Sequence, residues 1–196
     1  MNARGIMYTH FDNYLIYLKV EKNASPKTIA SYQKDFFRGL DFFADLLKKE
    51  DHAVLPTDLD HRTFRHYLAF LKKQGLARTT AARHLAAWRS LYRYLQREGI
   101  IDDNPLIRVA SPKLDKKLPK FLFENEAAAL VESPDLSQPL GVRDRALLET
   151  LYAGGLRINE LVSLDLGDMD LATGYVRIMG KRSKERMVPL GSKAVE

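Results

Sequence analysis

Along the first hundred residues, apolar side chains recur every three or four positions, which is the period of an amphipathic α-helix. The clearest stripe follows Ser25, a favourable N-cap, and Pro26, a favourable first helical residue. It comprises Ile29, Tyr32, Phe36, Leu40, Phe43 and Leu47. Similar stripes predict helices at about residues 8–20, 58–75 (with Asp58 as N-cap) and 79–98. The pattern therefore predicts a bundle of four helices.

The predicted fourth helix separates its apolar side chains from its basic ones. The apolar arc consists of Ala81, Leu85, Trp88, Tyr92 and Leu95. The other half carries five arginines, namely Arg78, Arg83, Arg89, Arg93 and Arg97. On the second helix, Lys27, Lys34 and Arg38 fall nearly opposite the apolar stripe. Two helices with basic outer faces suit a compact bundle that lies against a nucleic-acid duplex.

The helical period stops after residue 100, and a basic stretch bracketed by Pro112 and Pro119 follows. Because proline disfavours helix at its own position and at the preceding one, residues 111–120 are predicted to be a linker. The linker divides the chain into a helical unit, residues 1–110, and a second unit, residues 121–196. In the second unit we expect a short helix, a loop containing Pro134 and Pro139, two more helices and two strands, with every strand after residue 170. Their predicted ranges are 125–131, 142–152 and 157–164 for the helices, and 174–179 and 185–190 for the strands.

Composition and residue spacing add four constraints. The chain of 196 residues has a net charge of +6, and residues 61–100 hold nine Lys or Arg against the single acidic residue Glu98, which favours a polyanionic partner. It has no cysteine, which excludes disulfides and thiol nucleophiles and fits a reducing cytoplasm. No apolar run is long enough for a membrane helix. The five histidines share no metal-ligand spacing and are predicted to be surface or capping residues, so no histidine metal site is expected.

The candidate chemistry lies near the end of the chain. Arg157 follows Gly154-Gly155 and opens a predicted helix, with Glu160 three positions later, while Lys181 lies in the predicted turn between the two strands. These two cations, from independent elements, would suit one phosphate. By spacing alone, the Arg157–Glu160 pair fits a surface ion pair better than a catalytic pair, and Lys181 fits a solvated turn lysine better than a catalytic one.

The order of these motifs resembles the tyrosine recombinases, and most closely their Xer-like branch. The resemblance covers nearly the whole chain. It rests on residues 25–36 (SPKTIASYQKDF), 78–95 (RTTAARHLAAWRSLYRYL), the linker pairs Asn104-Pro105, Pro112-Lys113 and Leu118-Pro119-Lys120, residues 143–146 (RDRA), and the Arg157 and Lys181 motifs.

The resemblance implies a mainly α fold: an N-terminal four-helix, SAM-like core-binding bundle, followed by the first part, helices and a β-hairpin, of an α/β catalytic domain. It implies site-specific DNA strand exchange, in which a tyrosine attacks a phosphate, forms a 3′-phosphotyrosyl link and releases a 5′-hydroxyl. Arg157 would hold a non-bridging oxygen, Glu160 would orient Arg157, and Lys181 would protonate the leaving oxygen. The family uses no metal or cofactor for this step.

The resemblance and the basic faces together predict the contacts with DNA. The expected residues are Lys27, Thr28, Lys34 and Arg38 on the second helix, Arg78, Thr79, Thr80, Arg83 and Arg89 on the fourth, and Lys184 in the hairpin. Most of these contacts should be to phosphates. The implied partner is double-stranded DNA, bound at two sites by a tetramer that can include a second recombinase. The implied location is the cytoplasm, at the nucleoid, with no membrane association.

Three features depart from the family pattern. Arg182 stands after Lys181 where the family usually has Gly, none of the histidines begins a His-x-x-Arg box, and Tyr175, the only tyrosine after Arg157, is a poor nucleophile candidate. The family's nucleophile is expected beyond residue 196, so this chain should bind DNA without cutting it. Two alternatives stay open at this point: a non-catalytic DNA-binding module or decoy, and a helical adaptor whose basic face meets acidic protein or RNA.

Overall fold

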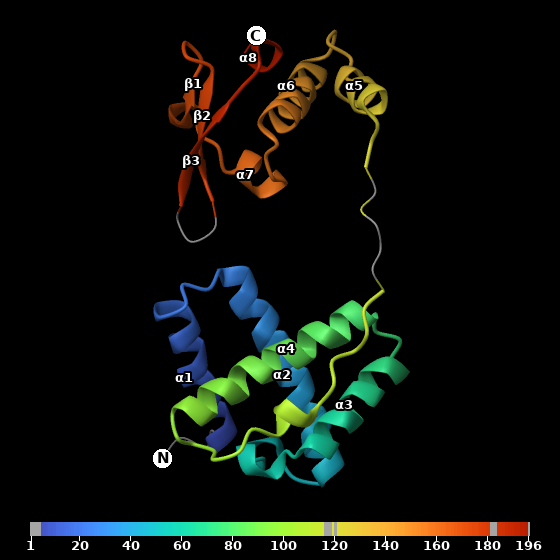
Figure 1. Cartoon of the computed structure of the whole chain (residues 1–196), viewed down its shortest axis with the longest axis vertical. Coiled ribbons are helices and arrows are strands. Elements are labelled where there is room, and N and C mark those ends of the chain that lie inside the picture. The colour runs from blue at the N-terminus through green and yellow to red at the C-terminus, as the bar shows by residue number, and fades with distance from the viewer. Residues whose placement is uncertain (1–4, 116–118, 120, 181–183, 196) are drawn as a thin grey trace. The chain divides into compact units, whose positions relative to one another are not determined.

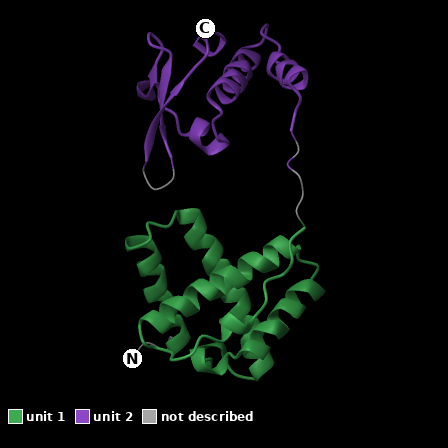
Figure 2. Cartoon of the chain, in the orientation of Figure 1, with its two compact units in different colours: residues 1–116 green, residues 117–196 purple. Residues whose placement is uncertain are grey.

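The computed structural model describes residues 5–115, 119, 121–180 and 184–195. The chain divides into two compact units, Met1–Lys116 and Lys117–Glu196, which are coloured separately in Figure 2. Each unit has its own apolar core, and each is described here by itself.

Unit 1 is the predicted four-helix bundle, built from α1 (Ile6–Val20), α2 (Pro26–Leu47), α3 (His61–Lys73) and α4 (Arg78–Arg97) (Figure 1). Three 3-10 turns complete it: η1 (Asp51–Ala53), η2 (Pro56–Asp58) and η3 (Pro105–Arg108). The expected start of α2 is confirmed, since the Ser25 hydroxyl accepts the Thr28 N–H at 3.2 Å and Pro26 is the first helical residue.

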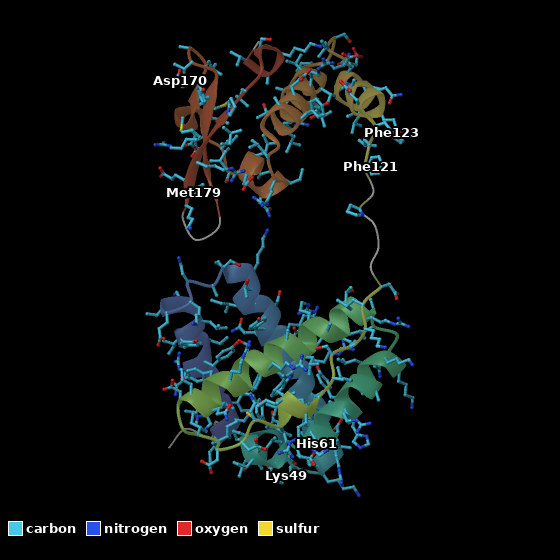
Figure 3. The ribbon with its side chains drawn as sticks, in the orientation of Figure 1. Lys49, His61, Phe121, Phe123, Asp170 and Met179 are labelled. Carbon is cyan, nitrogen blue, oxygen red and sulfur yellow. The ribbon has the colours of Figure 1, made fainter. Side chains whose placement is uncertain are left out.

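The N-cap predicted for the third helix is wrong. Asp60, not Asp58, caps α3, because its carboxylate accepts the Thr63 N–H at 2.8 Å. The Asp58 carboxylate instead accepts the Leu55 N–H at 2.8 Å and the ammonium of Lys49, labelled in Figure 3, at 2.6 Å. Asp58 therefore stabilises the preceding turn, and the helix begins later than predicted.

The core of unit 1 is aromatic and centres on Trp88. The predicted apolar arc of α4 is confirmed, because all five of its members are buried. The Trp88 ring lies against Phe36, Phe43 and Phe64, with ring centroids 5.1–5.7 Å apart. Gly39 on α2 permits this packing, since a Cβ there would lie 2.5 Å from the indole nitrogen of Trp88. The helices α2 and α4 thus pack directly on each other, which fixes the spacing of their outer faces.

Unit 2 consists of helices and a small antiparallel sheet. Its helices are α5 (Glu124–Glu132), α6 (Pro139–Gly154), α7 (Ile158–Val162) and α8 (Ser192–Val195), with η4 (Leu166–Asp168), and its strands are β1 (Met169–Asp170), β2 (Tyr175–Met179) and β3 (Glu185–Pro189), in the order β1-β2-β3. Pro139 was expected in a loop but is the first residue of α6, a position that tolerates proline. The two predicted strands are confirmed, whereas β1 begins before residue 170 and was missed. The mainly α fold with a late hairpin is confirmed.

The small core of unit 2 joins the sheet to its helices. Val176 and Ile178 of β2 are fully buried, together with Leu156 and Leu190. Helix α6 contacts α7, α8 and β3, so the turn after α6 lies beside the hairpin strands. This arrangement brings the Arg157 segment next to β3.

Candidate active site and nucleic-acid interface

The turn that presents Arg157 is built by Gly155. This glycine ends α6 in the left-handed conformation, with φ +55°, which favours a residue without a Cβ. Leu156 then turns into the core, and Arg157 follows in extended conformation as the N-cap residue of α7. Its side chain is 71% exposed. The Gly-Gly-Leu-Arg segment therefore directs a guanidinium away from the core.

Glu160 holds Arg157 at its base. One carboxylate oxygen accepts the backbone N–H of Arg157 at 2.8 Å, and the other accepts Nη1 of the same residue at 2.9 Å. Unlike Arg157, Glu160 is buried. The structure brings these two predicted residues together in a geometry that restricts the arginine while leaving it accessible.

A third residue of this cluster, Arg186, was not predicted. It donates Nη1 to Oε1 of Glu160 at 3.0 Å and Nη2 to Oε2 at 2.9 Å, a two-pronged contact that comes from β3. The hydrogen bonds from Arg186 and from the Arg157 backbone N–H lower the pKa of Glu160 to about 2 against the opposing effect of burial. Glu160 is therefore ionised throughout the physiological pH range, and it lies between two arginines.

Strand alternation is the sequence signal that could have revealed Arg186. In an antiparallel pair, directly opposed residues share a face of the sheet. Arg186 is opposite the buried Ile178, and Val188 is opposite the buried Val176. A charged residue on the inner face of a strand needs a partner of opposite charge nearby. That partner is Glu160, which the sequence linked only to Arg157.

The predicted Lys181 falls in the sequence between β2 and β3. Residues 181–183 lie outside the described residues, so the placement of Lys181 and Arg182 is not part of the site geometry. Around the turn, Met179 (labelled in Figure 3) pairs with Glu185, and the Gly180 N–H donates to the Lys184 carbonyl at 2.7 Å. Lys184 itself is exposed, and its contact with DNA stays a prediction.

Apart from Lys184, the predicted DNA-contacting residues lie on α2 and α4 of unit 1. Lys27, Lys34, Arg78 and Thr79 are exposed, while Thr28, Arg38 and Thr80 are half-buried. Thr28 has a local role as well, since its hydroxyl lies 2.9 Å from that of the N-cap Ser25. Arg78 forms an exposed ion pair with Asp115 at 3.2 Å. These residues are therefore accessible on helices whose spacing the core fixes.

Arg83 takes part in a buried polar chain. It donates to Asp35, whose carboxylate is fully buried on α2, while its own side chain is 42% exposed. The second Asp35 oxygen lies 3.3 Å from Nε2 of His84, and Nδ1 of His84 lies 2.8 Å from the Tyr67 hydroxyl. The expectation that all histidines are surface or capping residues is thus wrong for His84, which has its own buried polar partners.

Arg89 has internal partners instead of an open guanidinium. Its Nη1 donates to the Ser111 hydroxyl at 2.6 Å, and Nη2 donates to the Val109 carbonyl. Val109 is buried in the core of unit 1. Arg89 therefore fastens the segment before the linker to α4, a role that the sequence did not predict.

Two absences hold for the described part of the chain. No group of three or more His, Cys, Asp or Glu side chains is placed to hold a metal ion among these residues. Within the same residues, no helix has the length and apolar character needed to cross a membrane.

Comparisons with known proteins cover both units. Residues 11–99 match the family model described as the N-terminal SAM-like domain of phage integrases, and residues 120–196 match that of the phage integrase family. The tyrosine recombinase XerC of Pelotomaculum thermopropionicum is 72% identical over 97% of this chain, and that of Oceanobacillus iheyensis is 40% identical over 93%. The chain spans 62% and 58% of the lengths of these two relatives.

Solved structures show the same fold at lower identity. A lambda integrase tetramer bound to a Holliday junction matches 96% of this chain and 50% of its own, with a TM-score of 0.66 and 18% identity. The XerH recombinase bound to a palindromic difH substrate matches 89% of this chain and 51% of its own, with a TM-score of 0.65 and 22% identity. At these identities the likeness concerns the fold alone.

Proposed function

Because this chain belongs to the phage integrase family of tyrosine recombinases, we propose that it supplies the DNA-binding bundle and part of the catalytic pocket of a Xer-like site-specific recombinase. Such an enzyme cuts and rejoins duplex DNA through a 3′-phosphotyrosyl intermediate. The proposed substrate is duplex DNA at the nucleoid, in the cytoplasm, bound by a tetramer that spans two sites and can include a second recombinase.

The observation that carries this proposal is the anchored but exposed guanidinium of Arg157. Phosphoryl transfer is mainly a matter of position and charge, so it needs cations held in place before the reaction begins. Glu160 fixes Arg157 through both its backbone and its side chain, and 71% of the arginine side chain stays accessible. A planar guanidinium suits two oxygens of one phosphate better than an ammonium does. Arg157 is thus assigned to a non-bridging phosphate oxygen.

The remaining catalytic roles follow from the family resemblance. Lys181 is assigned to protonating the leaving 5′-oxygen, Glu160 to orienting Arg157, and Lys184 to a backbone contact beside the hairpin. Residues 1–196 alone should bind DNA without cleaving it, because the tyrosines of unit 2, Tyr152 and Tyr175, do not match the nucleophile position of the family.

The helical bundle of unit 1 is proposed to bind the DNA duplex. Lys27, Thr28, Lys34 and Arg38 on α2, together with Arg78, Thr79, Thr80 and Arg83 on α4, are proposed to face the DNA, mostly at phosphates. Arg83 is held by Asp35 on one side and is 42% exposed, so it can contact a phosphate from a fixed position. Arg89 contributes indirectly, by holding the segment that leads to the second unit.

Salt dependence tests the proposed DNA interface. Replacing Lys34 by Ala should reduce the slope of log affinity against log salt by about 0.9, the value expected when one phosphate contact and its displaced counterion are lost. The same reduction is expected for Arg78→Ala. The slopes are measured by fluorescence anisotropy on a labelled duplex between low and moderate salt.

Lys19→Ala is the matched control for this experiment, since Lys19 is an exposed lysine on α1, outside the proposed interface. It removes one positive charge and should leave the slope unchanged. Equal slopes for all three variants would contradict the interface. Stronger competition by an acidic protein than by duplex DNA would instead favour a helical adaptor.

Arg89→Ala should have a different effect from the surface variants. It removes two hydrogen bonds from a charged donor to the Val109–Ser111 segment, and a half-buried pair of this kind contributes about 1–3 kcal/mol to the free energy of unfolding. The expected result is a less stable unit 1 with a salt slope within error of the wild type. Urea unfolding followed by Trp88 fluorescence measures the first quantity. An unchanged midpoint together with a flatter slope would return Arg89 to the DNA interface.

A further inference from the structure

Arg186 occupies a position where an aliphatic residue would ordinarily pack. It lies on the inner face of the hairpin, opposite Ile178, and its nearest inward neighbour on β3 is the half-buried Val188. Its side chain is 40% exposed. Removing a guanidinium from water on this face costs free energy unless an opposite charge compensates it. Arg186 is therefore held there by its charged partner and not by apolar packing.

The contact it makes is geometrically demanding. Both terminal nitrogens of Arg186 meet both oxygens of Glu160, at 3.0 and 2.9 Å, in the parallel fork that an arginine and a carboxylate form best. Glu160 belongs to α7, and Arg186 belongs to β3. The fork therefore ties β3 to the helix whose N-cap residue is Arg157.

The contact also changes the charge that Arg157 can offer. Arg157 and Glu160 alone would form a neutral pair, and a neutral pair attracts a phosphate weakly. With Arg186 bound to the same carboxylate, the cluster of three has a net charge of +1. Arg157 donates Nη1 to Glu160, and most of its side chain remains exposed.

We infer that Arg186 is a positioning residue for the proposed phosphate site: by engaging both oxygens of Glu160, it fixes β3 against α7 and compensates the carboxylate, so that Arg157 meets a phosphate as a cation. The phosphate ligand in this inference rests on the proposed function. The contact between Arg186 and Glu160 does not depend on it. The depressed pKa of Glu160, caused first by Arg186, agrees with it.

Three variants of the 196-residue chain test the inference. Arg186→Ala removes the fork, Arg186→Lys keeps the charge without the fork, and Arg177→Ala is the matched control. Arg177 lies on β2 of the same sheet and makes two hydrogen bonds to Asp168, at 3.2 and 3.0 Å, so its loss costs a comparable ion pair away from Glu160. Two quantities are measured by NMR: the pKa of the Glu160 carboxyl from its ¹³C shift, and the affinity for inorganic phosphate from the side-chain ¹⁵N–¹H signal of Arg157.

In Arg186→Ala, the pKa of Glu160 should rise from about 2 towards the ordinary value of 4.5. Phosphate affinity at Arg157 should fall by about three- to tenfold, the effect of one elementary charge several ångströms away in a mostly aqueous setting. Arg186→Lys should give a smaller change in both quantities, because it restores the charge but not the fork. Arg177→Ala should leave both quantities as in the wild type.

Unchanged pKa and phosphate affinity in Arg186→Ala would overturn the inference, as would equal changes in Arg177→Ala. If Arg186→Ala unfolds unit 2, which the loss of dispersed sheet amide signals would reveal, Arg186→Lys decides by the same two measurements. If the Arg157 side-chain signal of the wild-type chain did not shift on addition of phosphate, the proposed function would be contradicted. In that case the pKa series still decides whether Arg186 stabilises the ionised Glu160 carboxylate.

Discussion

Replacing Arg157 by alanine is expected to slow DNA cleavage by about 10²–10³-fold, the loss seen when one preorganised donor to a developing oxyanion is removed. The measurement uses a chimera in which residues 1–196 are joined to the remaining length of the XerC relative that is 72% identical. The substrate is a nicked suicide duplex whose sequence is first selected for binding to residues 1–196. The covalent complex of the chimera with this duplex is followed as a denaturation-resistant band. The reason for the large loss is that Arg157 is fixed before the phosphate arrives, so no reorganisation is needed during the reaction.

The control for Arg157→Ala is Arg177→Ala. Arg177 also lies in unit 2, and its guanidinium is paired with Asp168. Its cleavage rate should equal that of the unmodified chimera. Residues 1–196 without the added length should bind the duplex and give no covalent band. A covalent band from residues 1–196 would refute the proposal that the nucleophile is absent from them. Failure of the chimera to cleave, with DNA binding retained, would favour a decoy function.

Lys181 should respond to a chemical change that leaves Arg157 unaffected. Lys181→Ala should slow cleavage of an ordinary substrate, since the leaving 5′-oxygen then lacks its proton donor. A 5′-thiol leaving group needs no proton, so it should restore the rate of Lys181→Ala but not that of Arg157→Ala. Rescue of Arg157→Ala by the thiol substrate would mean that the two roles are assigned the wrong way round.

Local patterns in the sequence were enough to predict helices α1 to α7 and the central pair of the site, but not the four-residue helix α8. The stripe on α2 and the arc on α4 are periodic over many turns, so burial of one face follows directly from them. Arg157 is the N-cap residue of α7 and Glu160 lies three positions later, so their contact needs no knowledge of the tertiary fold. The hairpin was predictable because both of its strands contain five residues with alternating burial.

What the sequence could not predict depends on pairs that are distant along the chain. Strand β1 has two residues, Met169 and Asp170, which are too few for an alternation to be recognised. The Arg186–Glu160 fork spans 26 positions, and the Arg83–Asp35 pair spans 48. Arg89 looked like its neighbours on the basic face of α4, and only the path of the segment at Val109 distinguishes it.

The buried histidine of unit 1 has a consequence for pH dependence. The pKa of His84 is lowered to about 4, first by burial and then by the nearby cations Arg83, Arg38 and Lys34. The unfolded chain takes up a proton at this histidine near its ordinary pKa of 6.5, whereas the folded chain resists it until about pH 4. Since the unfolded state binds more protons between these values, the free energy of unfolding must fall as the pH drops through this window.

Asp35 works in the opposite direction. Burial raises its pKa above the ordinary value of 3.8, although Arg83 opposes the shift. The folded chain therefore takes up a proton at Asp35 before the unfolded chain does, which adds stability as the pH falls. Because Asp35 is present in every variant to be compared, the effect of His84 is best isolated as a difference between variants.

Between pH 7 and pH 4.5, lowering one pKa from 6.5 to about 4 decreases the free energy of unfolding of the wild type by about 2–3 kcal/mol. We expect this decrease to be absent in His84→Gln. Glutamine does not titrate, and its amide is a neutral polar group like the unprotonated imidazole. Trp88 is the single tryptophan and is buried in the bundle, so urea unfolding followed by its fluorescence reports on unit 1. His66→Gln, at an exposed position on α3, should retain the wild-type pH dependence. If His84→Gln lost as much stability as the wild type over this range, His84 would have to be protonated in the folded bundle, with its charge balanced by Asp35.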